Sequence, residues 1–503
     1  MNIIKEISTN LHNLEIKYSQ LSWVKYTTGL DFGVTKAYED IVNHLKDSDY
    51  YNQITNTLDS ELNDLDKRSV ELLKKEFDPF HKSEEINKLQ LDINKKVNEL
   101  SQILNTHRCV FEGKEVSMVE LNQILSEDEN RDRRKEAYLV KNQVNQPLVD
   151  AGFLDLVKIR TKLAKLNGCD SFVEYKLREQ ELDVSLFDSW EKELKEVLPN
   201  IKRTREKFAK KYLNDTIIYP WDETYITSKI APSLNKQTNM TNFYTHLTNF
   251  FNKFDIDLSS YNITYDIFPR VNKSEWGYNF PIETGKDSRI LANVKNKYNE
   301  YRVLLHETGH GIHSFLLKPE EIMINRGVSG IISEGIANLF GSFMLDELFY
   351  SDFFETNEVK DEFAQLREWN KINSFRAIFR IFFDQQFYKE ELKDLDDIYK
   401  MYVRLSERLL EEDCYTCSPP WAFLIHHTTH PIYLHNYFMG DVTCEMLRKV
   451  FLELHNVTTI ADAPQAFGKF LKEEVIAPSG QYTFAELFKS ISGDDFSLKY
   501  MID

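Results

Sequence analysis

The chain has 503 residues, of which 42% are hydrophobic and 13% aromatic, enough to bury one large core or two lobes. Its net charge of -18 argues against nucleic-acid binding, which calls for a basic face. No secretory signal is visible in Met1 to Leu14, no segment reads as membrane-spanning, and five cysteines are too few and too odd in number for a disulfide framework. We therefore expect a cytoplasmic protein that contacts neither nucleic acid nor membrane.

Helical periodicity dominates the chain. Apolar residues recur at three- and four-residue steps over residues 86–104, which predicts a long amphipathic helix. With the similar stretch at 62–77 it is expected to form a helical hairpin. Residues 174–208 and 363–402 also have a helical pattern. The fold class predicted from these segments is mainly α.

A change of pattern occurs at residues 216–232, which contain two prolines and Trp221. This stretch is the predicted crossover between a helical N-terminal lobe, residues 1–215, and a catalytic lobe, residues 216–503. Within the second lobe, residues 261–268 and 290–294 are rich in β-forming residues. They predict a small sheet beside the helix that follows.

That helix carries the sequence His306-Glu307-Thr-Gly309-His310. Histidines four positions apart differ by roughly 40° around a helix, so both rings can reach one metal ion. Glu307 lies beside this face, where its carboxylate can act as a general base on water. The pattern is the zinc-hydrolase signature. The glycines at 309 and 311 weaken a helix, so we expect another element to approach there closely.

A catalytic zinc commonly takes three protein ligands, and Glu334 is the predicted third. It lies on an apolar helical pattern, where a lone acid would be costly to bury unless a metal compensated it. The alternative is an exposed glutamate on a surface helix. Asn338, one turn later, could hydrogen-bond a ligand histidine. His313 is too far along its helix for the same ion, which leaves a pocket residue or a packed histidine.

A second group of histidines lies between Trp421 and Gly440. Hydrolysis of an acyl compound develops negative charge on a carbonyl oxygen, and His427 and Tyr437 are the candidate donors that would stabilise it. His426 and His430 compete with His427 for this role. A buried aromatic helix face is the structural alternative.

Cys414 and Cys417 have the spacing of a redox or zinc pair. They precede two prolines, and no second pair follows. We expect reduced loop thiols.

These motifs together resemble the zinc oligopeptidases of the thimet oligopeptidase and oligoendopeptidase F family, a gluzincin group with the pattern His-Glu-x-Gly-His-x-x-His and a downstream glutamate ligand. The similarity spans roughly residues 120–445. Beyond the metal motif it includes five stretches, which are RRKEAY from Arg133, RTKLAKLNGCDSFVEY from Arg160, Pro220-Trp221-Asp222, SRILAN from Ser288 and PIYLHNYFMG from Pro431.

The resemblance implies a neurolysin-like, zincin-like fold with two helical lobes around a deep substrate cleft and a small sheet beside the zinc helix. It implies one Zn²⁺ per chain, short peptide substrates, and an edge strand at residues 288–294 that pairs with the peptide. His427 and Tyr437 would stabilise the tetrahedral intermediate. The chain departs from the family pattern at His435, which replaces a frequent tyrosine, and at Ala337 and Asn338.

Other functions stay open. The 23 residues between His310 and Glu334 match the spacing of dipeptidases of the angiotensin-converting-enzyme type, and Trp23 to Thr28 is similar to their early segment. Asp287-Ser-Arg289-Ile290 is similar to a motif of Taq-type carboxypeptidases. A non-catalytic helical peptide-binding protein is the alternative from another class.

Overall fold

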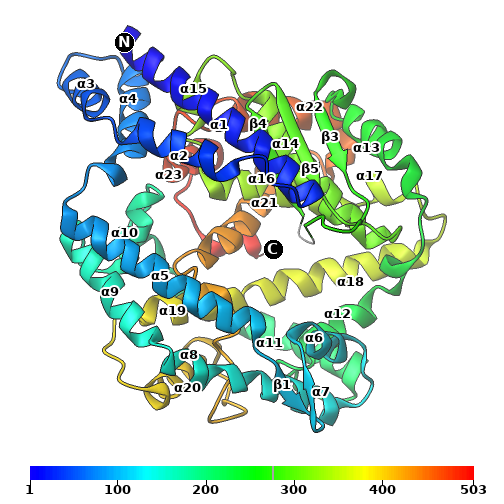
Figure 1. Ribbon diagram of the computed structural model, residues 1–503. Helices are drawn as coiled ribbons and strands as arrows, with labels where there is room; N and C mark the ends of the chain where they lie inside the picture. Colours follow the sequence, from blue (N-terminus) through cyan, green and yellow to red (C-terminus); the bar gives the residue numbers. More distant parts are fainter. Residues whose placement is uncertain (275–276, 503) are drawn as a thin grey trace. The chain divides into compact units, whose positions relative to one another are not determined.

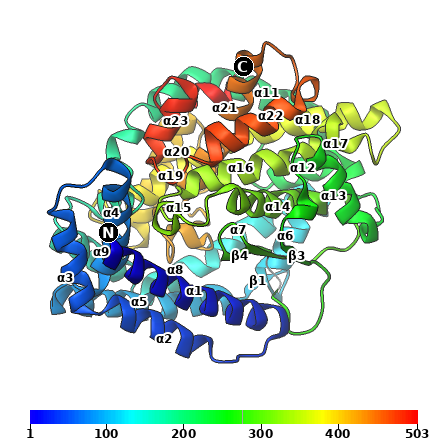
Figure 2. The same ribbon diagram turned by 90° about the horizontal axis from the view of Figure 1, so that it is seen from above.

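The computed structural model describes residues 1–274 and 277–502 (Figures 1 and 2), and most of them are helical. The chain forms two compact units, each assembled from separate segments. Unit 1 contains Met1–Ser83, Ser233–Glu355 and Met439–Phe496, and unit 2 contains Glu84–Pro232, Thr356–Phe438 and the segment from Ser497. These units divide the chain elsewhere than at residue 215, so the two-lobe division stays a prediction.

Unit 1 holds the predicted metal motif. Its helices are α1 (Asn2–Thr28), α2 (Val34–Leu45), α3 (Ser48–Leu58), α4 (Asp64–Phe77), α13 (Phe243–Asn252), α14 (Tyr301–Leu316), α15 (Ile322–Asn325), α16 (Gly330–Ser342), α17 (Glu347–Tyr350), α22 (Pro464–Phe470), α23 (Phe484–Ser492) and most of α21 (Leu434–His455). No helix in the described part of the chain is both long and apolar enough to cross a membrane.

A three-stranded sheet in unit 1 lies beside α14, as the sequence predicted. Its strands are β3 (Ile263–Asp266), β4 (Tyr278–Glu283) and β5 (Asp287–Leu291), in the order β3-β5-β4. β3 runs parallel to β5, and β4 runs antiparallel to it. Figure 1 shows these strands side by side.

The strand order corrects one expectation. Residues 288–294 were predicted as an edge strand, but β5 lies in the centre of the sheet and β4 is at the edge. The sequence did not predict β4 because Pro281 interrupts its β pattern. A proline is tolerated in an edge strand, where its missing N–H breaks no ladder hydrogen bond.

The helices α14 and α16 cross closely, and glycine permits the approach. A Cβ added at Gly309 would lie 3.0 Å from Phe340 Cδ2 and 3.1 Å from the Cα of Ala337. At Gly311 it would lie 3.4 Å from Ile263 Cδ1 on β3. The predicted close approach is thus confirmed at Gly309, whereas Gly311 is in ordinary van der Waals contact with β3. The helices α14 and α16 lie side by side (Figure 2), and this crossing brings His306 and His310 to Glu334.

Unit 2 is helical apart from a short hairpin of two strands. Its elements are α5 (Glu84–Thr106), β1 (Cys109–Phe111), β2 (Lys114–Val116), α6 (Met118–Glu127), α7 (Arg131–Leu139), α8 (Asn145–Asp150), α9 (Phe153–Leu166), α10 (Phe172–Glu179), α11 (Trp190–Leu213), α12 (Glu223–Ile230), α18 (Asn357–Ser374), α19 (Arg376–Gln386) and α20 (Leu395–Leu410).

The long predicted helices are present, but with breaks. Residues 174–208 fall in α10 and α11, and residues 363–402 fall in α18, α19 and α20. The predicted hairpin of α4 with α5 is wrong, because α4 packs on α3 and α15 of unit 1 whereas α5 packs on α9 of unit 2.

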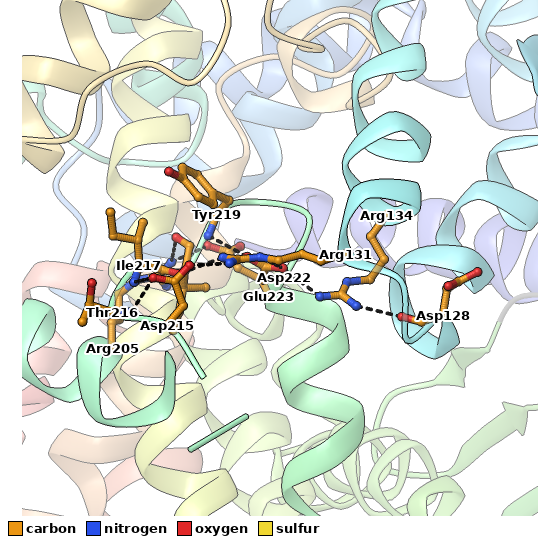
Figure 3. A network of polar contacts seen from close by, with 11 residues as sticks. Asp128, Arg131, Arg134, Arg205, Asp215, Thr216, Ile217, Tyr219, Asp222 and Glu223 are labelled. Carbon is orange, nitrogen blue, oxygen red and sulfur yellow. Dashed lines mark hydrogen bonds and ion pairs between the residues drawn. The ribbon is translucent and has the colours of Figure 1, made fainter. Parts of the chain in front are cut away.

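Buried ion pairs connect the helices of unit 2 (Figure 3). Asp222 is fully buried and accepts hydrogen bonds from Arg131 Nη2 at 2.7 Å and Arg134 Nη2 at 2.9 Å. Nearby, Arg205 Nη2 donates to the carbonyl of Ile218 at 3.3 Å and to Glu223 at 3.1 Å. Each buried charge of this network is paired with at least one opposite charge, which offsets the cost of removing it from water.

Candidate metal centre

Two histidines of α14 face the same direction. Their ring centroids are 4.9 Å apart, as expected for residues one turn apart on a helix. Burial lowers the pKa of His306 to about 3 and the pKa of His310 to about 4. Both rings are therefore neutral at pH 7, the form in which imidazole binds metal ions.

Glu334 on α16 completes the group. Its Oε2 lies 3.7 Å from His306 Nε2, and its Oε1 lies 4.0 Å from His310 Nε2. The three ligand atoms lie within 4.8 Å of one another, the one such group of three or more donors found in the described residues. Two imidazoles and one carboxylate form a donor set that suits Zn²⁺ and leaves room for a fourth ligand. The side chains present therefore fit the metal that the sequence predicted.

Neighbouring side chains orient both histidines. His310 Nδ1 lies 2.9 Å from Ser333 Oγ, and the Asn338 side chain hydrogen-bonds His306. Asn338 Nδ2 in turn donates to Asp441 Oδ1 on α21 at 3.1 Å. The expected contact of Asn338 with a ligand histidine is thus present. Ser333 and Asp441 were missed, although an acid between Met439 and Val442, two apolar residues of α21, was a usable signal.

We expect Asn338→Leu to lower Zn²⁺ affinity by about 10- to 100-fold, because His306 would lose the group that fixes its ring. Competition with a chromogenic chelator measures this affinity without any assay of activity. Asn325→Leu, on the short helix α15, is the control. An unchanged affinity in Asn338→Leu would contradict the assigned contact.

Glu307 lies beside the donor group and outside it. Burial and the nearby Glu334 carboxylate raise the pKa of Glu307 to about 7, while the backbone N–H of Asn279 on β4 opposes the shift. A carboxyl group with such a pKa can both accept and release a proton near neutral pH. The edge strand thus contacts the predicted general base directly.

His313 lies away from this group. Its side chain is buried, and its Nε2 lies 3.2 Å from Ser479 Oγ. Of the two alternatives that the sequence left open, the structure shows a packed, hydrogen-bonded histidine.

The second histidine group belongs to unit 2. His427 is buried, with Nδ1 3.2 Å from the Trp421 carbonyl and its ring against Phe383. Its Nε2 has no hydrogen-bond partner among the described residues. His426 instead packs against Tyr437, with ring centroids 5.7 Å apart, and Tyr437 is 43% exposed. The structure therefore brings His426, rather than His427, to Tyr437.

The cysteines show no disulfide in the described residues. Cys414 and Cys417 lie in the loop after α20, and both are free. Cys414 Sγ donates to the carbonyl of Thr416 at 3.0 Å. A pair of loop thiols is what the sequence predicted.

Comparison with known proteins adds independent evidence. Residues 124–256 match Peptidase family M3, and this segment ends before α14 begins. Over these residues the match confirms the predicted resemblance to a zinc peptidase family. No curated protein matches the chain.

Two solved structures share the fold. The M32 carboxypeptidase from Deinococcus radiodurans R1 is 12% identical, with 99% of this chain and 96% of that chain covered and a TM-score of 0.66. PZ peptidase A, solved with an inhibitor, is 16% identical, with 97% and 88% covered and a TM-score of 0.70. At such identities the likeness shows the fold alone, and it confirms the predicted mainly α, zincin-like class. The M3 match together with the donor group supports a metallopeptidase.

Proposed function

We propose that this protein hydrolyses peptide bonds in short peptides, with Zn²⁺ held by His306, His310 and Glu334. The observation that carries the proposal is the meeting of these three donors beside a half-buried glutamate, Glu307. When bound, Zn²⁺ supplies a Lewis acid that polarises the peptide carbonyl and makes water more acidic.

Glu307 is the proposed general base. Its carboxylate accepts the proton of the attacking water and then returns that proton to the leaving amine nitrogen. The Asn279 N–H, donated from β4, holds the carboxylate in place.

The edge strand β4 is the proposed support for the substrate backbone. The Asn279 N–H contacts Glu307 and therefore points away from β5. Because successive N–H groups of a strand point to opposite edges, residue 281 faces the same way as Asn279. Pro281 has no N–H to donate there. This edge therefore offers mainly carbonyl acceptors, to which the N–H groups of an extended peptide can donate.

Stabilisation of the oxyanion is assigned to Tyr437 and to a histidine of its group. His427 is the candidate from the sequence. The ring contact with Tyr437 and the partial exposure of His426 support His426 for this role. A Tyr hydroxyl and an imidazole N–H are both suitable donors to a developing negative charge.

Cleavage at a chain end is the second candidate. The fold likeness to an M32 carboxypeptidase favours it. Arg289 on β5 could bind a terminal carboxylate if it exchanged its present partner, the Asp287 carboxylate at 2.8 Å, for that of the peptide. Internal cleavage of oligopeptides remains the proposal that the M3 match supports.

Mass spectrometry of the products from a defined peptide mixture tests the proposal. We expect internal fragments, their loss after treatment with a chelator, and their return when Zn²⁺ is added back. Release of single residues or dipeptides from one end would favour the second candidate. Binding of the peptides without cleavage in the zinc-loaded protein would indicate a binding protein.

A further inference from the structure

The loop at residues 425–433 carries the exposed part of the second histidine group. Its side chains His426 and Tyr433 stack with ring centroids 5.9 Å apart, and Tyr433 packs on Tyr437 at 5.4 Å. Rings that face solvent need a fixed backbone if they are to keep one arrangement. Two buried charged side chains contact the backbone of this loop.

Arg160 of α9 holds one part of the loop. The residue is 2% exposed, and its Nη1 donates to the Thr428 carbonyl at 2.7 Å. Its Nη2 donates to the Thr429 carbonyl at 3.1 Å. Nη1 also reaches the hydroxyl of Tyr388 at 3.1 Å, which keeps the guanidinium group in position.

Asp384 of α19 holds the other part. It is 2% exposed, and its Oδ2 accepts a hydrogen bond from the backbone N–H of Ile432 at 2.6 Å. Ile432 has a φ of 57°, a left-handed conformation that is unfavourable for a β-branched residue. Such a backbone persists only where its surroundings enforce it, and the buried carboxyl group is the contact that does so.

The two buried groups use the loop as their partner. Among the described residues, neither Arg160 nor Asp384 has an oppositely charged side chain within ion-pair distance. Apart from the bond of Arg160 to the Tyr388 hydroxyl, their hydrogen bonds go to loop carbonyls and to a loop N–H. Loss of either group would leave polar loop atoms buried without partners, so the loop conformation depends on both.

The geometry points to Arg160 and Asp384 as positioning residues that hold the loop at residues 425–433 and so fix the rings of His426, Tyr433 and Tyr437. The catalytic consequence rests on the proposed function, in which Tyr437 and a histidine of this loop stabilise the oxyanion. The hold on the loop itself does not depend on that function.

Hydrogen exchange followed by mass spectrometry tests the hold on the loop. In Arg160→Met we expect amide exchange in peptides covering residues 425–433 to rise by at least about tenfold relative to the rest of unit 2. Arg205→Met is the matched control, since Arg205 is a buried arginine of the same unit with other partners. It should leave exchange at residues 425–433 unchanged.

Asp384 provides a graded pair of variants. Asp384→Ala should loosen the loop as Arg160→Met does, whereas Asp384→Asn keeps an acceptor for the Ile432 N–H and should restore most of the protection. Equal exchange at residues 425–433 in Arg160→Met and Arg205→Met would overturn the proposal, as would a loop that stays protected in Asp384→Ala.

Steady-state kinetics test the consequence for catalysis. We expect Arg160→Met and Asp384→Ala to lower kcat by about 10- to 100-fold with little change in KM, because misplaced groups act on the transition state. Arg205→Met should keep the wild-type kcat. A loosened loop with normal kcat would refute the positioning role. If the wild-type protein cleaves no peptide, the proposed function fails, and hydrogen exchange still decides whether Arg160 and Asp384 hold the loop.

Discussion

Glu307→Gln should abolish most peptide hydrolysis while zinc stays bound. The amide is close in size to the carboxylate but cannot accept the proton of water, so kcat should fall by about 10²- to 10⁴-fold. The substitution also removes the repulsion between the carboxylates of Glu307 and Glu334, so it should not disturb the three donors. Zinc stoichiometry by atomic absorption and kcat on a cleaved peptide are the two measurements.

The control for this variant is Glu320→Gln, an exposed glutamate in the segment after α14. It makes the same chemical change away from the donor group and should alter neither measurement. Full activity in Glu307→Gln would refute the assignment of Glu307 as the base. Loss of zinc from this variant would instead place Glu307 among the ligands.

The elements of the candidate metal centre were predictable because their signals are local. A histidine pair at a spacing of four needs only a helix, and the apolar pattern around His306 predicts that helix. Glu334 could be found because a lone acid in an apolar helical pattern requires a partner. Both expectations rest on short segments whose helical geometry fixes the relative directions of the side chains.

Features that depend on tertiary contacts could not be predicted in this way. The pairing of β5 with two neighbours, rather than one, depends on β4, whose Pro281 and polar residues obscure the strand pattern. The contact of Asp441 with Asn338 joins α21 to α16 across a hundred residues of sequence. Similarly, adjacent residues in a turn face different surroundings, so the sequence could not show that His426 packs on Tyr437 while His427 is buried.

The sequence also gave no direct sign of the two buried groups that hold the loop at residues 425–433. Arg160 lies in a stretch that resembles the M3 family, but only the fold shows that it reaches the carbonyls of Thr428 and Thr429. Like Glu334, Asp384 lies in a helix with an apolar pattern. Asp384 accepts a hydrogen bond from a backbone N–H, whereas Glu334 faces two histidines. An acid in an apolar helical pattern therefore indicates that it has a partner, but not which partner.

Glu334→Ala should separate two effects of this carboxyl group, which are its effect on the stability of the zinc-free protein and its contribution to zinc binding. Without zinc, burial raises the pKa of Glu334, which means that the folded protein disfavours its charged form. Removing this carboxyl group should therefore leave the melting temperature of the zinc-free protein unchanged or slightly higher. Zinc affinity should fall by more than about 100-fold, the upper effect of altering a residue that only supports a ligand.

Thermal unfolding with and without Zn²⁺ shows both effects in one experiment, because a ligand that binds only the folded state raises Tm by an amount that grows with the logarithm of its affinity. Wild type and Glu320→Ala should show the full zinc-dependent rise, and Glu334→Ala little or none. Gly440→Ala should give an intermediate rise, since the added Cβ would lie 3.1 Å from Glu334 Cβ and displace a ligand that is still present. A full zinc-dependent rise in Glu334→Ala would mean that this carboxylate does not bind the metal, and the proposed zinc site would then lack its third ligand.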